Sequence, residues 1–287
     1  MSKISNAQKP KRKSLRLVVQ FFFFILVLLI VINKALVENG QGIPFLGHMS
    51  LHAICPFGGI ESLYSLFTAG VFVQKIHASS MVLTVAVFII SILFGPAFCS
   101  WICPFGTVQE FVGKIGRKIF KRRYNNFIPV KLDYYLRYIR YFVLGLVLYN
   151  TAVTAKLVFQ NYDPYYALFN FFTNEVAITA YIALIMTLVL SLFIERPFCK
   201  YLCPYGSILG LFNYIRIFKI RRAESTCINC GACDVSCPMN IKVSQKNSVN
   251  DHQCISCMQC TSEAACPIAN TVTLSTKLKQ EAKKYEG

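Results

Sequence analysis

The chain has 287 residues, of which 55% are hydrophobic and 15% are charged, and its formal net charge is +17. This composition is typical of a membrane protein and argues against a soluble globular domain. The lysines and arginines crowd beside the hydrophobic segments, as membrane topology requires, so the positive charge does not indicate nucleic-acid binding.

Four apolar stretches are each long enough to cross a bilayer, which takes about 20 helical residues. They cover residues 15–36, 79–97, 137–158 and 176–195. Basic residues precede the first stretch, and basic runs follow the second and the fourth. The positive-inside rule therefore predicts a multi-pass protein of the cytoplasmic membrane, with its N-terminus and residues 196–287 in the cytoplasm.

A nine-residue motif occurs twice, as FCSWICPFG at residues 98–106 and as FCKYLCPYG at residues 198–206. In each half an outer segment, 55–67 or 162–172, lies before the apolar stretch that leads into the motif. These outer segments are too short to span, so we expect re-entrant or interfacial helices. The predicted architecture is mainly α-helical, with four transmembrane helices arranged as two parallel repeats.

The two motifs contribute four cysteines, Cys99, Cys103, Cys199 and Cys203. Residues four apart share one face of a helix, so each pair presents two sulfurs in one direction. Pro104 and Pro204 interrupt the helix that follows. Three interpretations stay open: the four sulfurs bind a further metal or cluster, they act as redox-active thiols, or they only pack at a turn.

Eight more cysteines form two runs between residues 227 and 266, and each run ends in Cys-Pro. The first run has the spacing of bacterial ferredoxins, in which three thiolates hold one cubane and the fourth reaches the other cluster. Gly231 permits the close turn that this spacing needs. In the second run the last gap is five residues rather than three.

This spacing predicts two [4Fe–4S] clusters with one exchanged ligand each. The first set is Cys227, Cys230, Cys233 and Cys266, and the second is Cys254, Cys257, Cys260 and Cys237. A pair of zinc sites is the alternative, although zinc usually takes two Cys-x-x-Cys hooks rather than a triplet followed by Cys-Pro.

The expected domains follow from these features. A basic N-terminus (1–14) precedes the first two-span repeat (15–110), and a basic loop (111–136) precedes the second (137–215). Residues 216–274 are expected to form a small α+β ferredoxin domain with two cubanes, and residues 275–287 a charged tail.

Weaker candidate residues lie in the predicted outer segments. His48, His52 and Cys55 are candidates for binding copper or lining a quinone pocket, or else are only interfacial. Glu61 and Asp163 are the acidic residues best placed to take protons from a quinol. The sequence contains no Cys-x-x-Cys-His motif and no nucleotide-binding glycine loop, so haem, flavin and nucleotide are not expected.

Four spans, paired Cys-x-x-x-Cys-Pro motifs and a cysteine-rich C-terminal domain together resemble the membrane-bound polyferredoxins of the NapH, NosR and CcoG group. The resemblance covers nearly the whole chain and is strongest to the NapH-like core. It implies electron transfer through or along the membrane, with the quinol pool as one source of electrons and a redox protein or complex as partner.

The leading hypothesis is an integral membrane iron–sulfur protein that moves single electrons between a membrane donor or acceptor, such as a quinol, and a redox partner. It would then act as an electron-transfer component or a quinol-oxidising subunit. The alternative is a copper reductase or an assembly or regulatory factor that uses the thiols of the repeated motif. Function at this level rests on analogy with the fold family.

Overall fold

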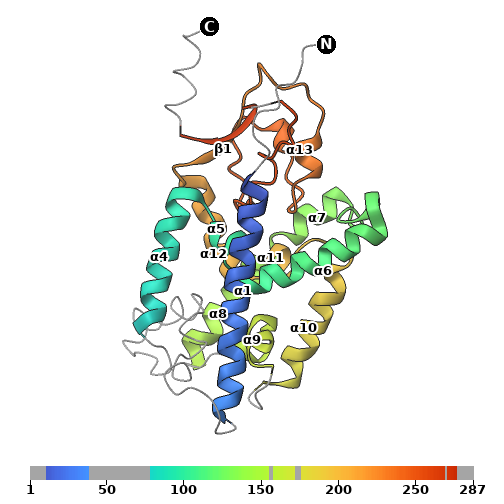
Figure 1. Cartoon of the computed structure of the whole chain (residues 1–287). Coiled ribbons are helices and arrows are strands. Elements are labelled where there is room, and N and C mark those ends of the chain that lie inside the picture. Colours follow the sequence, from blue (N-terminus) through green and yellow to red (C-terminus); the bar gives the residue numbers. More distant parts are fainter. Residues whose placement is uncertain (1–10, 39–77, 155–157, 172–175, 269, 277–287) are drawn as a thin grey trace.

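The computed structural model describes residues 11–38, 78–154, 158–171, 176–268 and 270–276 (Figure 1). A helical part carries the two repeated motifs, and a small cysteine-rich domain with little regular structure lies at one end of it (Figure 1). The predicted outer segment 55–67 lies outside the described residues.

Helix α1 (Lys11–Glu38) contains a stretch, Leu15–Asn33, that is long and apolar enough to cross a membrane. No other helix in the described ranges meets that length and composition. Helices α4 (Ala78–Phe94), α8 (Ile139–Thr154) and α10 (Ile178–Ser191) have 17, 16 and 14 residues. The structure therefore supports the first predicted span, while the other three predicted spans fall on helices that are shorter than about 20 residues within the described ranges.

The two motifs fold alike. In the first, α4 ends before Gly95, whose φ of 81° only glycine adopts freely, and Pro96 follows. The short helix α5 (Ala97–Trp101) then carries Cys99, and α6 (Pro104–Phe120) begins directly after Cys103. The second motif has the same order, with α11 (Pro197–Tyr201) followed by α12 (Pro204–Ile215). Proline at the first helical position lacks an N–H that the helix does not need there, so each Cys-Pro starts a new helix.

This arrangement corrects one expectation. The two cysteines of a motif do not share one face of a continuous helix, because Cys99 lies on α5 and Cys103 caps α6. Cys199 and Cys203 are divided in the same way between α11 and the cap of α12.

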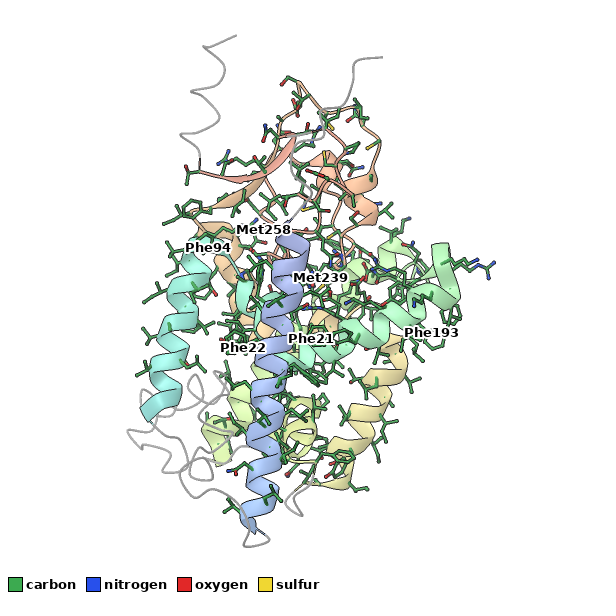
Figure 2. The ribbon with its side chains drawn as sticks, in the orientation of Figure 1. Phe21, Phe22, Phe94, Phe193, Met239 and Met258 are labelled. Atoms are coloured by element: carbon green, nitrogen blue, oxygen red, sulfur yellow. The ribbon has the colours of Figure 1, made fainter. Side chains whose placement is uncertain are left out.

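The helices after the motifs cross between the halves. We define the first half as α1, α4, α5 and α6, and the second half as α8, α10, α11 and α12. Helix α6 packs against α1 of its own half and α10 of the other, and α12 packs against α8 of its own half and α4 of the other. Phe21 on α1 contacts Phe111 on α6, with ring centroids 5.1 Å apart (Figure 2). The two halves are therefore related by an approximate two-fold axis.

Shorter elements fill the connections. They are η2 (Lys121–Arg123), α7 (Val130–Leu136), η3 (Val158–Asn161) and α9 (Pro164–Phe169). Helix α9 falls in the predicted outer segment 162–172 and packs against α10.

The C-terminal domain contains one two-stranded antiparallel sheet. Strand β1 (Lys219–Arg222) pairs with β2 (Val272–Ser275), and Lys219 lies opposite Ser275. Between the strands lie α13 (Ala232–Val235) and η4 (Val243–Gln245). The sheet closes the domain by joining its first and last described segments, and the cysteine loops lie between them.

The C-terminal domain is fixed to the end of α4. Figure 2 shows Phe94 at that end, and its ring stacks on Phe218 with centroids 5.0 Å apart. The backbone N–H groups of Ile217 and Phe218 donate to carbonyls at the end of α4, and the Ser256 hydroxyl donates to the Phe94 carbonyl at 2.7 Å. Backbone and side-chain bonds therefore set the domain's position on the helices.

A buried carboxylate joins the two halves. Glu110 on α6 accepts from Arg16 on α1 at 2.5 Å and from Arg196, which precedes α11, at 2.6 Å. Gln20 donates to the same carboxylate at 3.2 Å. The pKa of Glu110 falls to about 2: burial alone would raise it, but the two guanidinium groups outweigh that effect. Glu110 is therefore ionised at neutral pH and offsets part of the positive charge of both arginines.

We predict that Glu110→Gln destabilises the protein by about 3–5 kcal/mol, because it leaves two buried guanidinium groups without their counter-charge. Denaturant unfolding of the purified protein measures the effect. Glu263→Gln is the matched control, since Glu263 is exposed, and should change stability by less than about 0.5 kcal/mol. Equal stability of the two variants would contradict the role given to Glu110.

Candidate cysteine sites

Two cavities in the C-terminal domain are each lined by four cysteines. The first cavity has Cys227, Cys230, Cys233 and Cys266 in its wall. The second has Cys237, Cys254, Cys257 and Cys260. Each cavity takes three cysteines from one run and one from the other. Across the described chain, no three His, Cys, Asp or Glu side chains meet closely enough to hold one metal ion, so the sulfurs surround a space.

The two cysteine loops have the same backbone form. Asn229 and Ser256, each two residues after the first cysteine of its run, have φ of 54° and 51°. Gly231 and Met258, two residues further on, have φ of 68° and 57°. A residue with a Cβ, such as Met258, rarely adopts left-handed backbone. The surrounding structure therefore holds the loop in this shape. Both loops thus wrap their cysteines around the cavity in the same way.

The longer gap in the second run forms a turn. The backbone N–H groups of Ala265 and Cys266 donate to the Ser262 carbonyl, at 2.9 and 2.8 Å. Glu263 and Ala264 are exposed at the outside of this turn. The added residues are therefore accommodated at the surface, and Cys266 still faces the first cavity.

The two cavities differ in exposure. Cys230 of the first cavity is exposed, whereas Cys254 and Cys260 of the second are buried. The wall of the second cavity is apolar, with Met239 and Ile241 among its residues. The first cavity therefore includes the more exposed cysteines.

The second cavity lies beside the helices. Both halves hold the loop before Cys257: Asn213 donates to the Cys254 carbonyl at 2.8 Å, and Trp101 donates to the Ser256 carbonyl at 3.2 Å. Arg216, which is fully buried, donates to the Ser256 hydroxyl at 3.0 Å and lies 3.6 Å from the Cys254 sulfur.

The four cysteines of the repeated motif come together where the halves meet. Phe98 of the first motif packs against Tyr205 of the second, with ring centroids 5.8 Å apart. Phe105 of the first packs against Phe198 of the second at 5.4 Å. These two pairs exchange equivalent positions, as expected at a two-fold axis. The axis brings the two motifs together, and Cys103 of the first motif and Cys203 of the second pack against the same two apolar cores.

These four cysteines connect two cores. Cys99 and Cys199 pack against the core of the C-terminal domain, which includes cysteines of both cavities. Cys103 and Cys203 pack against the apolar cores of the helical part. The four motif cysteines therefore lie where the helical part meets the C-terminal domain.

Free thiols in this group would be unreactive. Burial raises the pKa of Cys103 to about 12, and it also raises the pKa of Cys199. A thiol with such a pKa stays protonated at neutral pH and is a poor nucleophile. The environment is therefore unlike that of exposed cysteines that exchange disulfides with a partner.

Sequence reasoning missed the buried polar residues around the cysteines. Arg140, Arg196 and Arg216 are nearly fully buried, and so is Gln109, which donates to the Cys199 sulfur at 3.6 Å. Arg216 belongs to the basic run after the fourth apolar stretch, where the positive-inside rule alone gives no reason to expect a buried side chain. One feature of the sequence indicates a role for Arg196 near the cysteines: it comes directly before the Pro-Phe-Cys of the second motif.

The weaker outer candidates are mostly untested. His48, His52, Cys55 and Glu61 lie outside the described residues. Asp163 is described and caps α9, where its carboxylate accepts from the Tyr165 N–H at 3.0 Å. Asp163 thus has a capping role, and its part in taking protons from a quinol stays a prediction.

Comparison with known proteins agrees with the cysteine pattern. A family model described as a 4Fe-4S binding domain matches residues 76–123 and again residues 176–223. A second, described as a 4Fe-4S dicluster domain, matches residues 219–283. Both motifs and the C-terminal domain thus lie within matched regions.

Several curated proteins are similar. YccM of Escherichia coli (strain K12) is 36% identical over 77% of this chain and 62% of its own length. The uncharacterized protein MJ0750 of Methanocaldococcus jannaschii is 30% identical over 73% of this chain and 82% of its own. The ferredoxin-type protein NapH of Haemophilus influenzae is 29% identical over 59% of this chain and 60% of its own. No solved structure matches the chain.

Paired cysteine motifs on a helical frame with a cysteine-rich domain define a ferredoxin-type protein with 4Fe–4S domains. The chain belongs to the NapH-like family of 4Fe–4S ferredoxin-type proteins. It spans 62% of the length of YccM and 60% of that of NapH.

We predict that Asp163 makes stability depend on pH. Burial raises the pKa of its carboxyl to about 7, against about 3.9 in an unfolded chain. Between these values the folded protein keeps a proton that the unfolded chain has released, so stability falls as pH rises from about 4 to 7. Asp163→Asn keeps the cap without an ionisable group.

Unfolding of wild type and Asp163→Asn at pH 5 and pH 8 tests this prediction. The variant should lose less stability than wild type between the two pH values. Glu263→Gln, at an exposed position, should behave as wild type. An unchanged pH dependence in Asp163→Asn would show that this carboxyl is ionised in the folded protein.

Proposed function

We propose that this protein is an integral membrane electron carrier. It moves single electrons between a membrane donor or acceptor and a redox partner, through two [4Fe–4S] clusters in its C-terminal domain. The observation that carries the proposal is the pair of cavities, each lined by four cysteines drawn from both runs.

The residues present fit two such clusters. Cys227, Cys230, Cys233 and Cys266 would hold one cluster, and Cys254, Cys257, Cys260 and Cys237 the other. The matched left-handed positions in the two loops support this assignment, because they wrap three cysteines of each run around one cavity. When bound, such clusters supply one-electron transfer.

The helical part supports a location in the membrane. Large apolar side chains that are more than half exposed occur on α1, α4, α8 and α10: Phe22, Leu29, Val82, Phe142, Ile178 and Ile185. Exposed apolar surface on this scale needs a cover, and lipid would provide it. The basic N-terminus and the basic residues Lys219, Arg221 and Arg222 favour a cytoplasmic C-terminal domain.

A quinol is the donor class that we propose. Its oxidation to quinone releases two electrons and two protons, and each cluster accepts one electron. The two electrons therefore leave one after the other, from the membrane side through the buried second set of cysteines to the more exposed first set. The first set is where we expect a redox partner to dock, since Cys230 is exposed.

The copper-reductase alternative has less support. It needs thiols that ionise readily at neutral pH, whereas burial raises the pKa of both Cys103 and Cys199.

We expect a quinol analogue to reduce the purified protein in detergent under anaerobic conditions. Loss of visible absorbance and the appearance of paramagnetic resonance signals measure the reduction, and an added one-electron acceptor should reverse it. A variant without the second set, such as Cys254→Ser, should lose this response. Protein that dithionite reduces but no quinol analogue reduces would rule out a quinol as donor.

The exchanged ligands give a second prediction. Cys227→Ser and Cys266→Ser should remove the same resonance signal, while Cys254→Ser and Cys237→Ser should remove the other. Ser236→Ala, beside Cys237 and with its hydroxyl bonded to the Ala232 carbonyl, is the matched control and should keep both signals. If Cys266→Ser removes the same signal as Cys254→Ser, each run holds its own cluster and the assignment is wrong.

A further inference from the structure

We propose that Cys99, Cys103, Cys199 and Cys203 together bind a third iron–sulfur cluster, with two ligands from each half. The inference rests on the proposed electron-transfer function and extends its path. It also accounts for a group of buried polar residues around these cysteines that the two clusters of the C-terminal domain leave unexplained.

Symmetry gives the first argument. The pairs Phe98–Tyr205 and Phe105–Phe198 place the two motifs face to face about the approximate two-fold axis. Each half then offers one cysteine on a short helix and one at the cap of the next helix. Four sulfurs in two equivalent pairs suit a cubane, whose four iron corners each take one thiolate.

Hydrogen-bond donors point at the sulfurs. The Gly206 N–H donates to the Cys203 sulfur at 3.3 Å, at the N-terminus of the 12-residue helix α12. Cys103 holds the equivalent N-cap position of the 17-residue helix α6. Two helix N-termini thus place partial positive charge beside the sulfurs, which favours thiolate over thiol.

A buried amide is an independent observation. Gln109 is fully buried, and its Nε2 donates to the Cys199 sulfur at 3.6 Å. Its Oε1 has no hydrogen-bond partner among the described residues. Burying an amide whose oxygen has no hydrogen-bond partner costs free energy. We therefore expect its N–H group to donate to a strong acceptor, which would offset part of that cost. A thiolate bound to iron is such an acceptor, and a neutral thiol is a weak one.

Charge gives a further argument. The buried charged side chains of the described residues include five cations, Arg16, Arg140, Arg196, Lys200 and Arg216, against three anions, Glu110, Asp133 and Glu195. Arg140 and Arg196 act electrostatically on both Cys99 and Cys199. Arg140 has no carboxylate partner in the described chain; it donates to the His252 carbonyl at 2.9 Å.

A buried cation without a counter-charge is strongly unfavourable. Four neutral thiols do not supply that charge. The negative charge of four thiolates exceeds the positive charge of an iron–sulfide core, so a bound cluster is an anion. Such an anion offsets the buried positive charge of Arg140. The same excess of buried positive charge disfavours a disulfide within each motif, because a disulfide is neutral.

The location suits a relay. Cys99 and Cys199 contact the core that holds the second cavity, while Cys103 and Cys203 contact the cores of the helical part. A cluster here takes one electron from the membrane side and passes one electron to the second set of cysteines. It shortens the gap between a quinol in the membrane and the C-terminal domain.

Iron and acid-labile sulfide per chain, in an anaerobic preparation of the full protein, test the proposal. We expect about twelve irons, four for each of three clusters. Replacing all four motif cysteines by serine should lower the count to about eight and keep both signals of the C-terminal domain. Ser100→Ala, between Cys99 and Cys103, is the matched control and should keep about twelve.

The outcomes separate the two proposals. About eight irons in the wild-type protein overturn the third cluster and leave the proposed function standing. Fewer than about four overturn both. Twelve irons in the wild type and in the four-serine variant also overturn the third cluster, since the extra iron then lies elsewhere.

A milder variant covers the case in which the four-serine protein does not fold. Gln109→Leu removes the N–H that points at Cys199 and should lower the reduction potential of one resonance signal only. We expect a change of up to about tenfold in its reduction equilibrium, or about 59 mV. An unchanged potential for every signal would count against a cluster beside Gln109.

Discussion

The Cys-Pro bonds at the start of α6 and α12 determine the positions of the other elements. Proline cannot continue the helix before it, because it lacks an N–H and its ring clashes with the preceding turn. The chain therefore changes direction at Cys103 and Cys203, and each new helix leaves across the other half. Gly116 permits the crossing of α6 over the end of α10, since a Cβ there would lie 2.0 Å from the Leu192 carbonyl oxygen. Both cysteines that precede these bonds thus lie at helix N-termini, close to the two-fold axis.

Charged side chains are buried where α6 and α12 cross between the two halves. Arg16, Arg196 and Glu110 join α1, α6 and α11, while Asp133 on α7 binds Lys200 at 3.0 Å and also pairs with Arg137. In both groups two cations share one carboxylate, so positive charge remains after pairing. Such an interior is costly for a protein without cofactors and suitable for one that holds anionic clusters. The excess of buried positive charge in the helical part is therefore consistent with anionic clusters bound by the cysteines.

Much of this organisation could be predicted from the sequence, because cysteine spacing and proline position act locally. The family was predicted and is confirmed. The cavities group the C-terminal cysteines in the two sets that ferredoxin spacing predicts, although cluster binding there stays a prediction. Hydropathy alone placed the end of α4 three residues too late, although Gly95 and Pro96 mark that end in the sequence. The roles of Gln109, Arg140 and Arg196 depend on contacts between distant segments, which no local pattern records.

The crossed helices carry a consequence for the origin of the fold. Neither half can cover its own motif, since α6 needs α10 and α12 needs α4. A protein with a single copy of the repeat would leave its cysteine motif uncovered unless two identical chains came together about a true two-fold axis. The present chain is what gene duplication and fusion of such a symmetric dimer would produce. Once fused, the halves could diverge, and the side chains that now differ between them, such as Arg196 in place of Pro96, would be the marks of that divergence.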